Sequence, residues 1–458
     1  MKTRLFSVFS VLIIFTILLG ACAQPPAPTP EEAASTEAAA PPAAEEEEVK
    51  LVFWFWAEPD APGANAWIET AVQDYKKVKP NVTVEVVPQG TDALISGFQT
   101  AVSAGSGGPD IASQWATGQV MGFVWQDALL PVTDYVAEAE LDHWLNLDEN
   151  LYNEKIWGAP MYLLTIAIMY NKELFAQAGV TPPDVGERWS WDTFIAACQK
   201  LKDAGITPFG IGDLGGYGGA WFWANFGGQN LDSVLDLRQA VIGEASFLEE
   251  RFTGFYKELD MMVKSGFFNS DIMSRDLSYG NDLFSQGQVA MAFGTDGFIS
   301  QAIKDMGADK FGITQIPRWG SGKLADYGNS TQSISFLITK QSKNPQAAAD
   351  FLAFLHSPEI LKSWYKATGI IPADNRFNPG EITEPLIQQL FVIKTNGPQV
   401  WLENFIPGQI DAEGDLAAGE LIFSQSGTPE EAAQTWENAA ETWRTQHPDE
   451  LEKWKNWK

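Results

Sequence analysis

Cysteine and histidine are scarce in this chain. It has 2 cysteines and 3 histidines among its 458 residues. So few cysteines exclude a disulfide framework and a cysteine-based metal site. The histidines, His143, His356 and His447, are far apart in the sequence and lie in no metal-binding or nucleophile motif. The sequence therefore predicts no metal and no cofactor. It also weakens the case for an enzyme, although catalysis by carboxylates alone is compatible with this composition.

Basic residues are scarce as well. The chain has 30 Lys and Arg against 59 Asp and Glu, which gives a formal net charge of -29. The sequence pI is about 4.4. A surface of this charge repels polyanions, so it argues against binding to nucleic acid and against electrostatic attachment to anionic lipid.

Only the amino terminus carries a long apolar run. Lys2 and Arg4 precede the run from Leu5 to Leu18, and Leu19-Gly20-Ala21-Cys22 follows. The run is shorter than the roughly 20 residues that span a bilayer. The pattern is typical of a lipoprotein signal peptide, residues 1–21, that leaves an acylated Cys22. We therefore expect an extracytoplasmic protein, lipid-anchored to the cell membrane at the cell surface or in the periplasm.

The next segment, residues 22–48, has the composition of a spacer. From Ala23 to Glu48 it contains no aromatic residue and no aliphatic side chain larger than alanine. Such a stretch buries too little apolar surface to fold. Its prolines and its closing run of four glutamates favour an extended chain. We expect a disordered tether.

The roughly 410 residues beyond the tether suit two domains. Val49 to Trp56 has strand composition, Trp67 to Val78 has helical periodicity, and Val82 to Val87 is a second strand. This β-α-β order implies parallel pairing and an α/β fold. Further strands are predicted at Asp110 to Ala112, Thr165 to Tyr170, Val289 to Phe293, Phe311 to Ile316 and Ile334 to Thr339, and further helices at Asp92 to Ala104, Trp191 to Ala204, Phe252 to Lys264, Asn344 to Leu355, Pro358 to Ala367 and Pro429 to Arg444.

Three features are best explained by packing. Cys198 lies in an amphipathic helical stretch, so we expect a buried core thiol. Trp436 and Trp443 are seven residues apart in a predicted helix, which is typical of a core stripe. The glycine-rich patch from Gly210 to Gly228 lacks a P-loop lysine and a dinucleotide fingerprint, so it does not predict a phosphate site.

Several motifs occur in an order that resembles the extracellular solute-binding proteins of ABC importers, in particular the sugar-binding, maltose-binding-protein-like branch. The resemblance runs through nearly all of residues 49 to 458, and a short insertion between Pro183 and Trp189 is the main departure. The motifs are Gly108-Pro109-Asp110-Ile111, Trp157-Gly158-Ala159-Pro160-Met161-Tyr162, Ile168 to Phe175, Trp189-Ser190-Trp191-Asp192, Gln286 to Met291 and Thr368 to Pro372.

This resemblance implies a two-lobed periplasmic-binding-protein type II fold. Each lobe would be a mostly parallel sheet flanked by helices, with the ligand cleft between the lobes. Matching the motif positions places chain crossings near Thr165, Ile338 and Ile370. The N-lobe would then comprise residues 49–165 plus 338–370, and the C-lobe residues 166–337 plus 371–458.

The resemblance also implies a function. The chain would be a monomeric substrate-binding lipoprotein, not an enzyme, that captures a carbohydrate by lobe closure and delivers it to the transmembrane permease subunits of an ABC importer. Closure would hide the ligand in a desolvated cleft.

Aromatic residues supply candidate sugar contacts, because a flat indole packs well on the apolar face of a sugar ring. The chain has 18 tryptophans. Trp56 follows the first strand, and crevices at strand carboxyl ends bind ligands in open α/β sheets. Trp221 and Trp223 form a second aromatic cluster, for which a role as core fillers is an equally good interpretation.

Hydroxyl-rich ligands also need hydrogen-bond acceptors, and a carboxylate can accept from two neighbouring hydroxyls. The acidic candidates are Glu58, Asp60 and Asp296, although many acidic side chains in so acidic a chain are solvated surface charges. Trp223, Asp296 and Trp56 rank first among all candidates. The resemblance adds Gln114, Trp115, Tyr162, Trp319 and Asn329.

Two alternatives stay open. A polyamine would suit aromatic side chains combined with carboxylates. A carboxylate-based glycosidase would need two acids about 5 to 9.5 Å apart across a cleft, a distance that the sequence does not give.

Overall fold

The computed structural model describes residues 47–184, 186–327, 330–395 and 401–457. The predicted signal peptide, Cys22, the tether up to residue 46 and Asn329 lie outside these residues. Among the described residues, no helix combines the length and the apolar composition that a membrane span requires.

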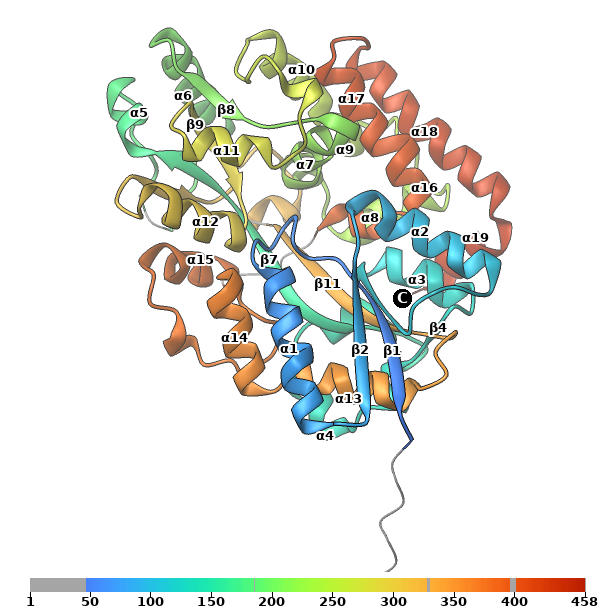
Figure 1. The fold of residues 1–458 in the computed structure, drawn as a ribbon. Coiled ribbons are helices and arrows are strands. Elements are labelled where there is room, and N and C mark those ends of the chain that lie inside the picture. Colours follow the sequence, from blue (N-terminus) through green and yellow to red (C-terminus); the bar gives the residue numbers. More distant parts are fainter. Residues whose placement is uncertain (1–46, 185, 328–329, 396–400, 458) are drawn as a thin grey trace, which may run out of the picture. The chain divides into compact units, whose positions relative to one another are not determined.

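The first β-α-β unit is confirmed. Strand β1 (Val49–Phe55), helix α1 (Ala64–Val78) and strand β2 (Val82–Pro88) follow one another. The two strands pair in parallel, with Val49 opposite Val82 and Phe55 opposite Pro88. After helix α2 (Thr91–Ala104; Figure 1), strand β3 (Ile111–Trp115) pairs in parallel on the other side of β1.

One sheet, in the order β2-β1-β3-β11-β7-β9-β8, runs through the described chain. Strand β8 (Thr207–Gly210) pairs in parallel with β9 (Val289–Gly294). The long strands β7 (Ala159–Asn171) and β11 (Ser330–Thr339) pair antiparallel with each other and with their outer neighbours β9 and β3. The sheet is therefore mixed, and these antiparallel pairings add to the parallel ones that the β-α-β order predicts.

Strand β7 changes partners along its length. Its first part, up to Ile166, pairs with β11. From Ala167 onward it pairs with β9, and from Ile168 onward also with β10 (Phe311–Thr314). The remaining strands are short: β4 (Leu129–Leu130), β5 (Leu151–Tyr152) and β6 (Lys155–Ile156).

Helices cover the sheet, and most of the predicted ones are present. The predicted helix from Phe252 to Lys264 is divided by Gly254 into α9 and α10. Ser190 caps α6 by accepting from the amide of Thr193 at 3.3 Å, as its sequence predicts. The helices are α3 (Gly118–Trp125), α4 (Glu138–Leu141), α5 (Lys172–Gln177), α6 (Trp191–Asp203), α7 (Tyr217–Phe226), α8 (Val234–Val241), α9 (Glu250–Thr253), α10 (Phe255–Lys264), α11 (Tyr279–Ser285), α12 (Asp296–Met306), α13 (Pro345–Leu355), α14 (Pro358–Thr368), α15 (Pro385–Thr395), α16 (Gly408–Ile410), α17 (Ala417–Phe423), α18 (Pro429–Gln446) and α19 (Pro448–Asn456), with a 3-10 turn η8 (Leu402–Phe405) and a π-helix η9 (Asp411–Leu416).

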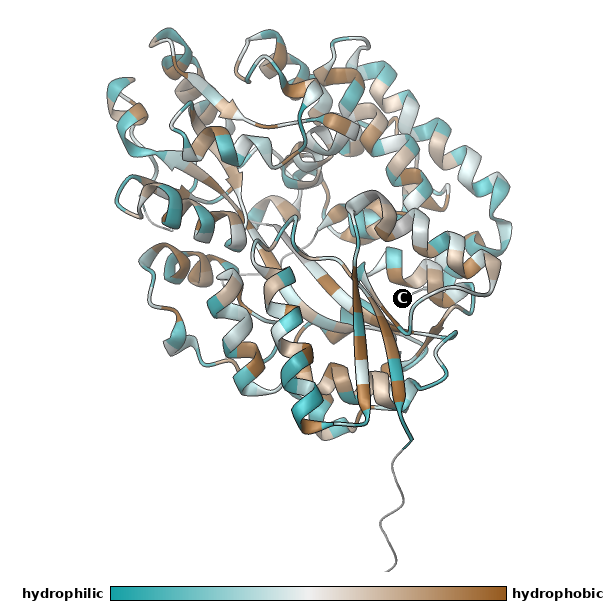
Figure 2. Ribbon diagram, in the orientation of Figure 1, coloured by the Kyte–Doolittle hydropathy of each residue, from teal (hydrophilic) through white to brown (hydrophobic). Residues whose placement is uncertain are grey.

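Two apolar clusters form the core. In the second half of β7, Ile166 and Ile168 belong to one cluster, and Ala167 and Met169 belong to the other, as strand alternation requires. Figure 2 shows the alternation of apolar and more polar residues along the first part of β2. Cys198, Trp436 and Trp443 are buried in the first cluster, which confirms their predicted packing roles.

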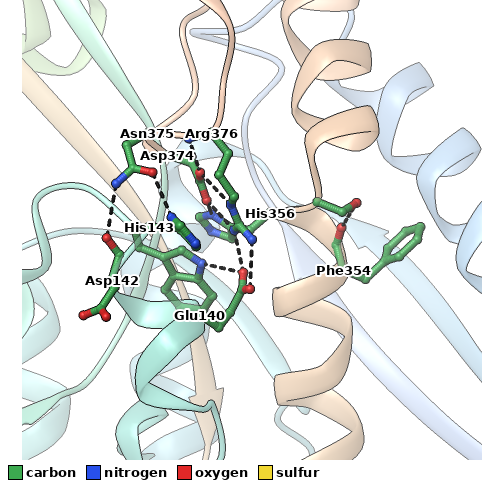
Figure 3. A network of polar contacts seen from close by, with 10 residues as sticks. Glu140, Asp142, His143, Phe354, His356, Asp374, Asn375 and Arg376 are labelled. Atoms are coloured by element: carbon green, nitrogen blue, oxygen red, sulfur yellow. Dashed lines mark hydrogen bonds and ion pairs between the residues drawn. The ribbon is translucent and has the colours of Figure 1, made fainter.

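A buried polar network ties α4, α13 and the segment after α14 together (Figure 3). The carboxylate of Asp374 accepts from Nδ1 of His356 at 3.1 Å and from the guanidinium of Arg376 at 2.7 Å. The same guanidinium pairs with Glu140. The ring of Trp144 stacks on His356 with centroids 4.2 Å apart. These contacts join segments more than 200 residues apart in sequence, since 236 positions separate Glu140 and Arg376.

Glycine is required where α7 meets α17. A Cβ placed on Gly219 would lie 2.2 Å from Cα of Gly419, and one on Gly216 would lie 2.2 Å from the carbonyl oxygen of Leu416. The glycine-rich patch therefore lets two backbones approach, which brings the segment before α7 next to the π-helix η9.

We expect Gly219→Ala to lower the free energy of unfolding by about 1 to 3 kcal/mol, because the added methyl group meets backbone atoms that cannot rotate away. Urea denaturation would measure the change. Gly122→Ala is the control, since a Cβ there meets no atom within 4 Å. Equal stability of the two variants would contradict the proposed close approach.

Candidate functional site

Three strand carboxyl ends meet at one place. Asp60 follows β1, Asp213 follows β8, and α12 begins directly after β9. The loop after β1 touches the start of α12, because a Cβ on Gly297 would lie 2.5 Å from the carbonyl oxygen of Asp60. Crevices at the carboxyl ends of strands are the usual ligand sites of open α/β sheets.

Asp60 and Tyr162 occupy the β1 side of this site. Asp60 is only 8% exposed, and this burial raises the pKa of its carboxyl group to about 7. The Tyr162 side chain is fully buried and stacks on Trp364, while its hydroxyl has no hydrogen-bond partner among the described residues. Burial raises the pKa of Tyr162, and the charge of nearby Asp60 adds to this effect.

A chain of hydrogen bonds holds the opposite side. The indole N–H of Trp436 donates to the hydroxyl of Tyr256 at 2.9 Å, and that hydroxyl donates to Oδ1 of Asp415 at 3.1 Å. Asp213 accepts from the amide of Gly219 at 2.8 Å. Both carboxyl groups are fully buried.

Two further carboxyl groups come from the segment before α17. Glu403, in η8, accepts from the indole N–H of Trp401 at 3.0 Å. Asp411 and Asp415 lie on the π-helix η9, four residues apart. Single turns of π-helix are uncommon in proteins, and many of those that occur lie at functional sites.

These five carboxyl groups form what we call the acidic cluster: Asp60, Asp213, Glu403, Asp411 and Asp415. Burial is the largest cause of the raised pKa of every member, and for Asp213, Glu403 and Asp415 the charges of neighbouring carboxyl groups raise it further. The pKa of Asp213 and that of Asp411 rise to about 7, and that of Glu403 lies well above its usual range. After burial, the charges of Asp411, Asp415 and Asp60 raise the pKa of Glu403, so groups from both sides of the site influence it electrostatically.

The predicted contacts at the ends of β1 and β3 are only partly available to a ligand. The indole of Trp56 is buried and donates to Oγ1 of Thr91 at 3.2 Å. Gln114 is buried, and its amide donates to the carbonyl of Leu94 at 3.1 Å. Trp115 packs edge-on against Trp56 and is partly buried, and its indole N–H has no partner among the described residues. Trp115 is thus the best placed of the three.

The aromatic candidates Trp221, Trp223 and Trp319 belong to the first core cluster or pack against it. The indole N–H of Trp223 donates to the carbonyl of Phe252 at 2.8 Å, and its ring packs on Trp436. Trp221 packs on Trp401, the residue that holds Glu403. Trp319 packs on Phe255, and its amide donates to Gln229. For Trp223, this burial supports the interpretation as a core filler.

Two acidic candidates are engaged by the backbone. Glu58 accepts from the amides of Gly63 and Asn65 at 2.9 and 2.7 Å, so it caps the start of α1. Asp296 is fully buried and accepts from the amide of Thr165 at 2.7 Å. Burial raises the pKa of Asp296, and the opposing charge of Lys394 limits the rise. Both carboxylates fix local structure next to the site.

The sequence reasoning missed most of the acidic cluster. Of its five members, only Asp60 was a candidate. Of the two tyrosines beside the cluster, Tyr162 was a candidate and Tyr256 was not. Asp213 had one usable signal, because it is an acidic residue inside the glycine-rich patch that follows a strand. Asn329 lies outside the described residues.

A groove of about 580 Å³ opens between α3 and the carboxyl-terminal helices. Its volume lies in the range of small-molecule sites. Pro407 to Gln409, which line it, connect η8 to the π-helix η9 and thus border the segment that carries Glu403 and Asp411. Its polar lining includes Gln99, Gln119, Gln126, Gln409, His447 and Glu450, beside Trp443 and Trp454.

Comparison with known proteins gives the family. The model of the bacterial extracellular solute-binding proteins matches residues 59–362. A binding protein of Brucella abortus is 26% identical over 325 residues, which cover 67% of this chain and 72% of the relative. The arabinooligosaccharide-binding protein of Bacillus subtilis is 24% identical over 326 residues, 65% of this chain and 66% of the relative.

The fold agrees with solved structures. A chitin oligosaccharide binding protein aligns with a TM-score of 0.75 at 19% identity, over 86% of this chain and 98% of that protein. The chain has the two-lobed, maltose-binding-protein-like fold of such neighbours. This fold and the match over residues 59–362 lead to one conclusion: the chain belongs to the bacterial extracellular solute-binding protein family.

Proposed function

We propose that this chain is the substrate-binding lipoprotein of an ABC importer and that it captures a mono- or oligosaccharide and delivers it to a membrane permease. The observation that carries the proposal is the convergence of carboxyl groups, a buried tyrosine hydroxyl and indoles at the carboxyl ends of β1, β8 and β9. Such groups bind sugar hydroxyls and sugar faces. Relatives named for arabinooligosaccharide and galactooligosaccharide binding support this ligand class.

The ligand contacts that we propose are Asp60, Trp115, Tyr162, Glu403 and Asp411. Tyr162 and Trp115 would each supply a hydrogen-bonding group that lacks a partner among the described residues. Capture requires binding alone, so we propose no catalytic role for these residues. The relatives and neighbours named above support this, since their names describe binding proteins.

Lobe closure would enclose the ligand. We keep the proposed lobes, residues 49–165 plus 338–370 and residues 166–337 plus 371–458. The change of partners of β7 between Ile166 and Ala167 supports a crossing near Thr165. We further propose that acylated Cys22 anchors a monomer to the membrane, on the basis of the sequence pattern alone.

The test is a thermal-shift and calorimetric screen of the full chain in detergent against pentose and hexose oligosaccharides. A ligand that binds only the native state raises the Tm, by an amount that grows with its concentration above Kd. We expect one sugar class to raise the Tm, and Tyr162→Phe to reduce that shift. Gln301→Ala is the control, because Gln301 is a partly exposed residue of α12 whose amide donates to Asp305. A shift with amino acids or phosphate esters and with no sugar would overturn the proposed ligand class.

A further inference from the structure

Three members of the acidic cluster share an arrangement in which one oxygen is held and the other is free. Oε2 of Glu403, Oδ1 of Asp415 and Oδ1 of Asp213 each accept a hydrogen bond from the protein. Oε1 of Glu403, Oδ2 of Asp415 and Oδ2 of Asp213 are buried and have no partner among the described residues, and the same is true of Oδ1 of Asp411. A buried acceptor without a donor is costly, so these oxygens indicate a place for a donor from outside the chain.

The charges of the cluster indicate which kind of hydrogen-bond donor a ligand would need. Within the described part of the chain, no ion pair joins a cluster member to Lys, Arg or His. Burial raises the pKa of Glu403 and of Asp415 most, and the charges that raise it further are those of other carboxyl groups. Hydroxyl groups of a neutral sugar would satisfy the oxygens but would leave the repulsion between carboxylates. An ammonium group supplies three donors and a positive charge together.

The aromatic residues at the cluster also suit a cation. Tyr256 and Trp401 hold two of the carboxyl groups through their polar ends, and aromatic side chains attract ammonium groups. Among the described residues, no three His, Cys, Asp or Glu side chains gather closely enough to hold a metal ion.

We propose that the ligand of this site is a sugar with a protonated amino group, and that this ammonium group lies among Glu403, Asp411 and Asp415. The inference rests on the proposed carbohydrate-binding function and makes it more specific. The remaining hydroxyl groups would reach Asp60 and Tyr162 on the β1 side. Binding would replace protons of the cluster by the ammonium group, so protons would be released to the buffer.

The experiment is calorimetric titration of the full chain in detergent, at slightly acidic pH, with three matched tetrasaccharides and with spermidine. The sugars are a glucosamine oligomer, its N-acetylated form and a glucose oligomer with the same linkage. Repeating the titration in buffers of different ionisation enthalpy measures the protons released. We expect the amino form to bind at least about tenfold more tightly than the other two, with net proton release.

Variants locate the ammonium group. Asp411→Asn and Glu403→Gln should each reduce the preference for the amino form by about tenfold. Glu413→Gln is the matched control, because Glu413 is exposed on the same π-helix and contacts Gln409. It should leave both the preference and the proton release unchanged.

The outcomes separate the two proposals. If the two neutral sugars bind as tightly as the amino form and no protons are released, the amino-sugar inference is overturned and the carbohydrate-binding function still stands. Binding of spermidine with no binding of any sugar would overturn both. A preference for the amino form that persists in Asp411→Asn and Glu403→Gln would overturn the assignment to this cluster.

Discussion

Asp374→Ala is expected to lower the free energy of unfolding by about 3 to 5 kcal/mol, the range for breaking one side of a buried ion pair. Asp374 is fully buried and accepts from His356 and from both the backbone and the guanidinium of Arg376. Its removal leaves these donors without an acceptor and leaves Arg376 with Glu140 alone (Figure 3). Chemical denaturation at neutral pH would measure the loss.

The pH dependence of this loss has a definite sign. Burial alone would raise the pKa of Asp374, but hydrogen bonds from His356 and Arg376 outweigh it and hold the pKa below its usual value. The folded state therefore binds fewer protons than the unfolded state, and the stability from Asp374 disappears as the pH falls below about 4. Wild type and variant should converge there.

Asp134→Ala is the matched control for Asp374. Asp134 pairs with Lys155 at 2.8 Å, but both side chains are 45% exposed. Exposed pairs contribute about 1 kcal/mol or less. If Asp374→Ala and Asp134→Ala lower the free energy of unfolding by the same amount, the network around Asp374 does not stabilise the fold as a buried ion pair would.

Local patterns in the sequence predict the fold well. The strand from Val49 and the helix ending at Val78 appear within a few residues of their predicted bounds, because periodicity and turn residues act within one element. The antiparallel pairing of β7 with β11 was not predicted. It joins residues more than 160 positions apart, as in Thr165 opposite Thr331, and no local pattern encodes it.

The candidate site was less predictable for the same reason. The sequence around Trp223 predicts a flat surface for a ligand. In the structure, however, its indole N–H donates to the carbonyl of Phe252 and its ring packs on Trp436. Asp411 and Asp415 have the spacing of an exposed acidic helix, whereas Asp415 is fully buried in a π-helix. Which carboxyl groups become buried depends on how distant segments pack. As ligand contacts, Trp56, Glu58, Gln114, Trp221, Trp223, Asp296 and Trp319 stay predictions.

The largest pH effect should come from the acidic cluster, and Asp60 shows it most simply because burial alone raises its pKa from 3.8 to about 7. Between these values the folded state binds more protons than the unfolded state, so stability is present below about pH 4 and is lost as the pH rises through about 7. A shift of this size corresponds to about 4 kcal/mol for a fully buried group. Other groups, such as His356 with its lowered pKa, change stability in the opposite direction below about pH 6.5.

Comparison with Asp60→Asn isolates the contribution of this carboxyl group, because the amide has nearly the same shape and no charge. In the ligand-free protein, the variant should match wild type below about pH 4 and exceed its free energy of unfolding by up to about 4 kcal/mol near pH 8. Asp309→Asn, at an 80% exposed side chain, should follow the wild-type curve throughout. Parallel curves for wild type and Asp60→Asn would mean that Asp60 is not desolvated in the folded chain. If the difference in free energy of unfolding between the two proteins grows with pH, the site without ligand carries unfavourable negative charge at neutral pH. A cationic ligand would compensate this charge on binding.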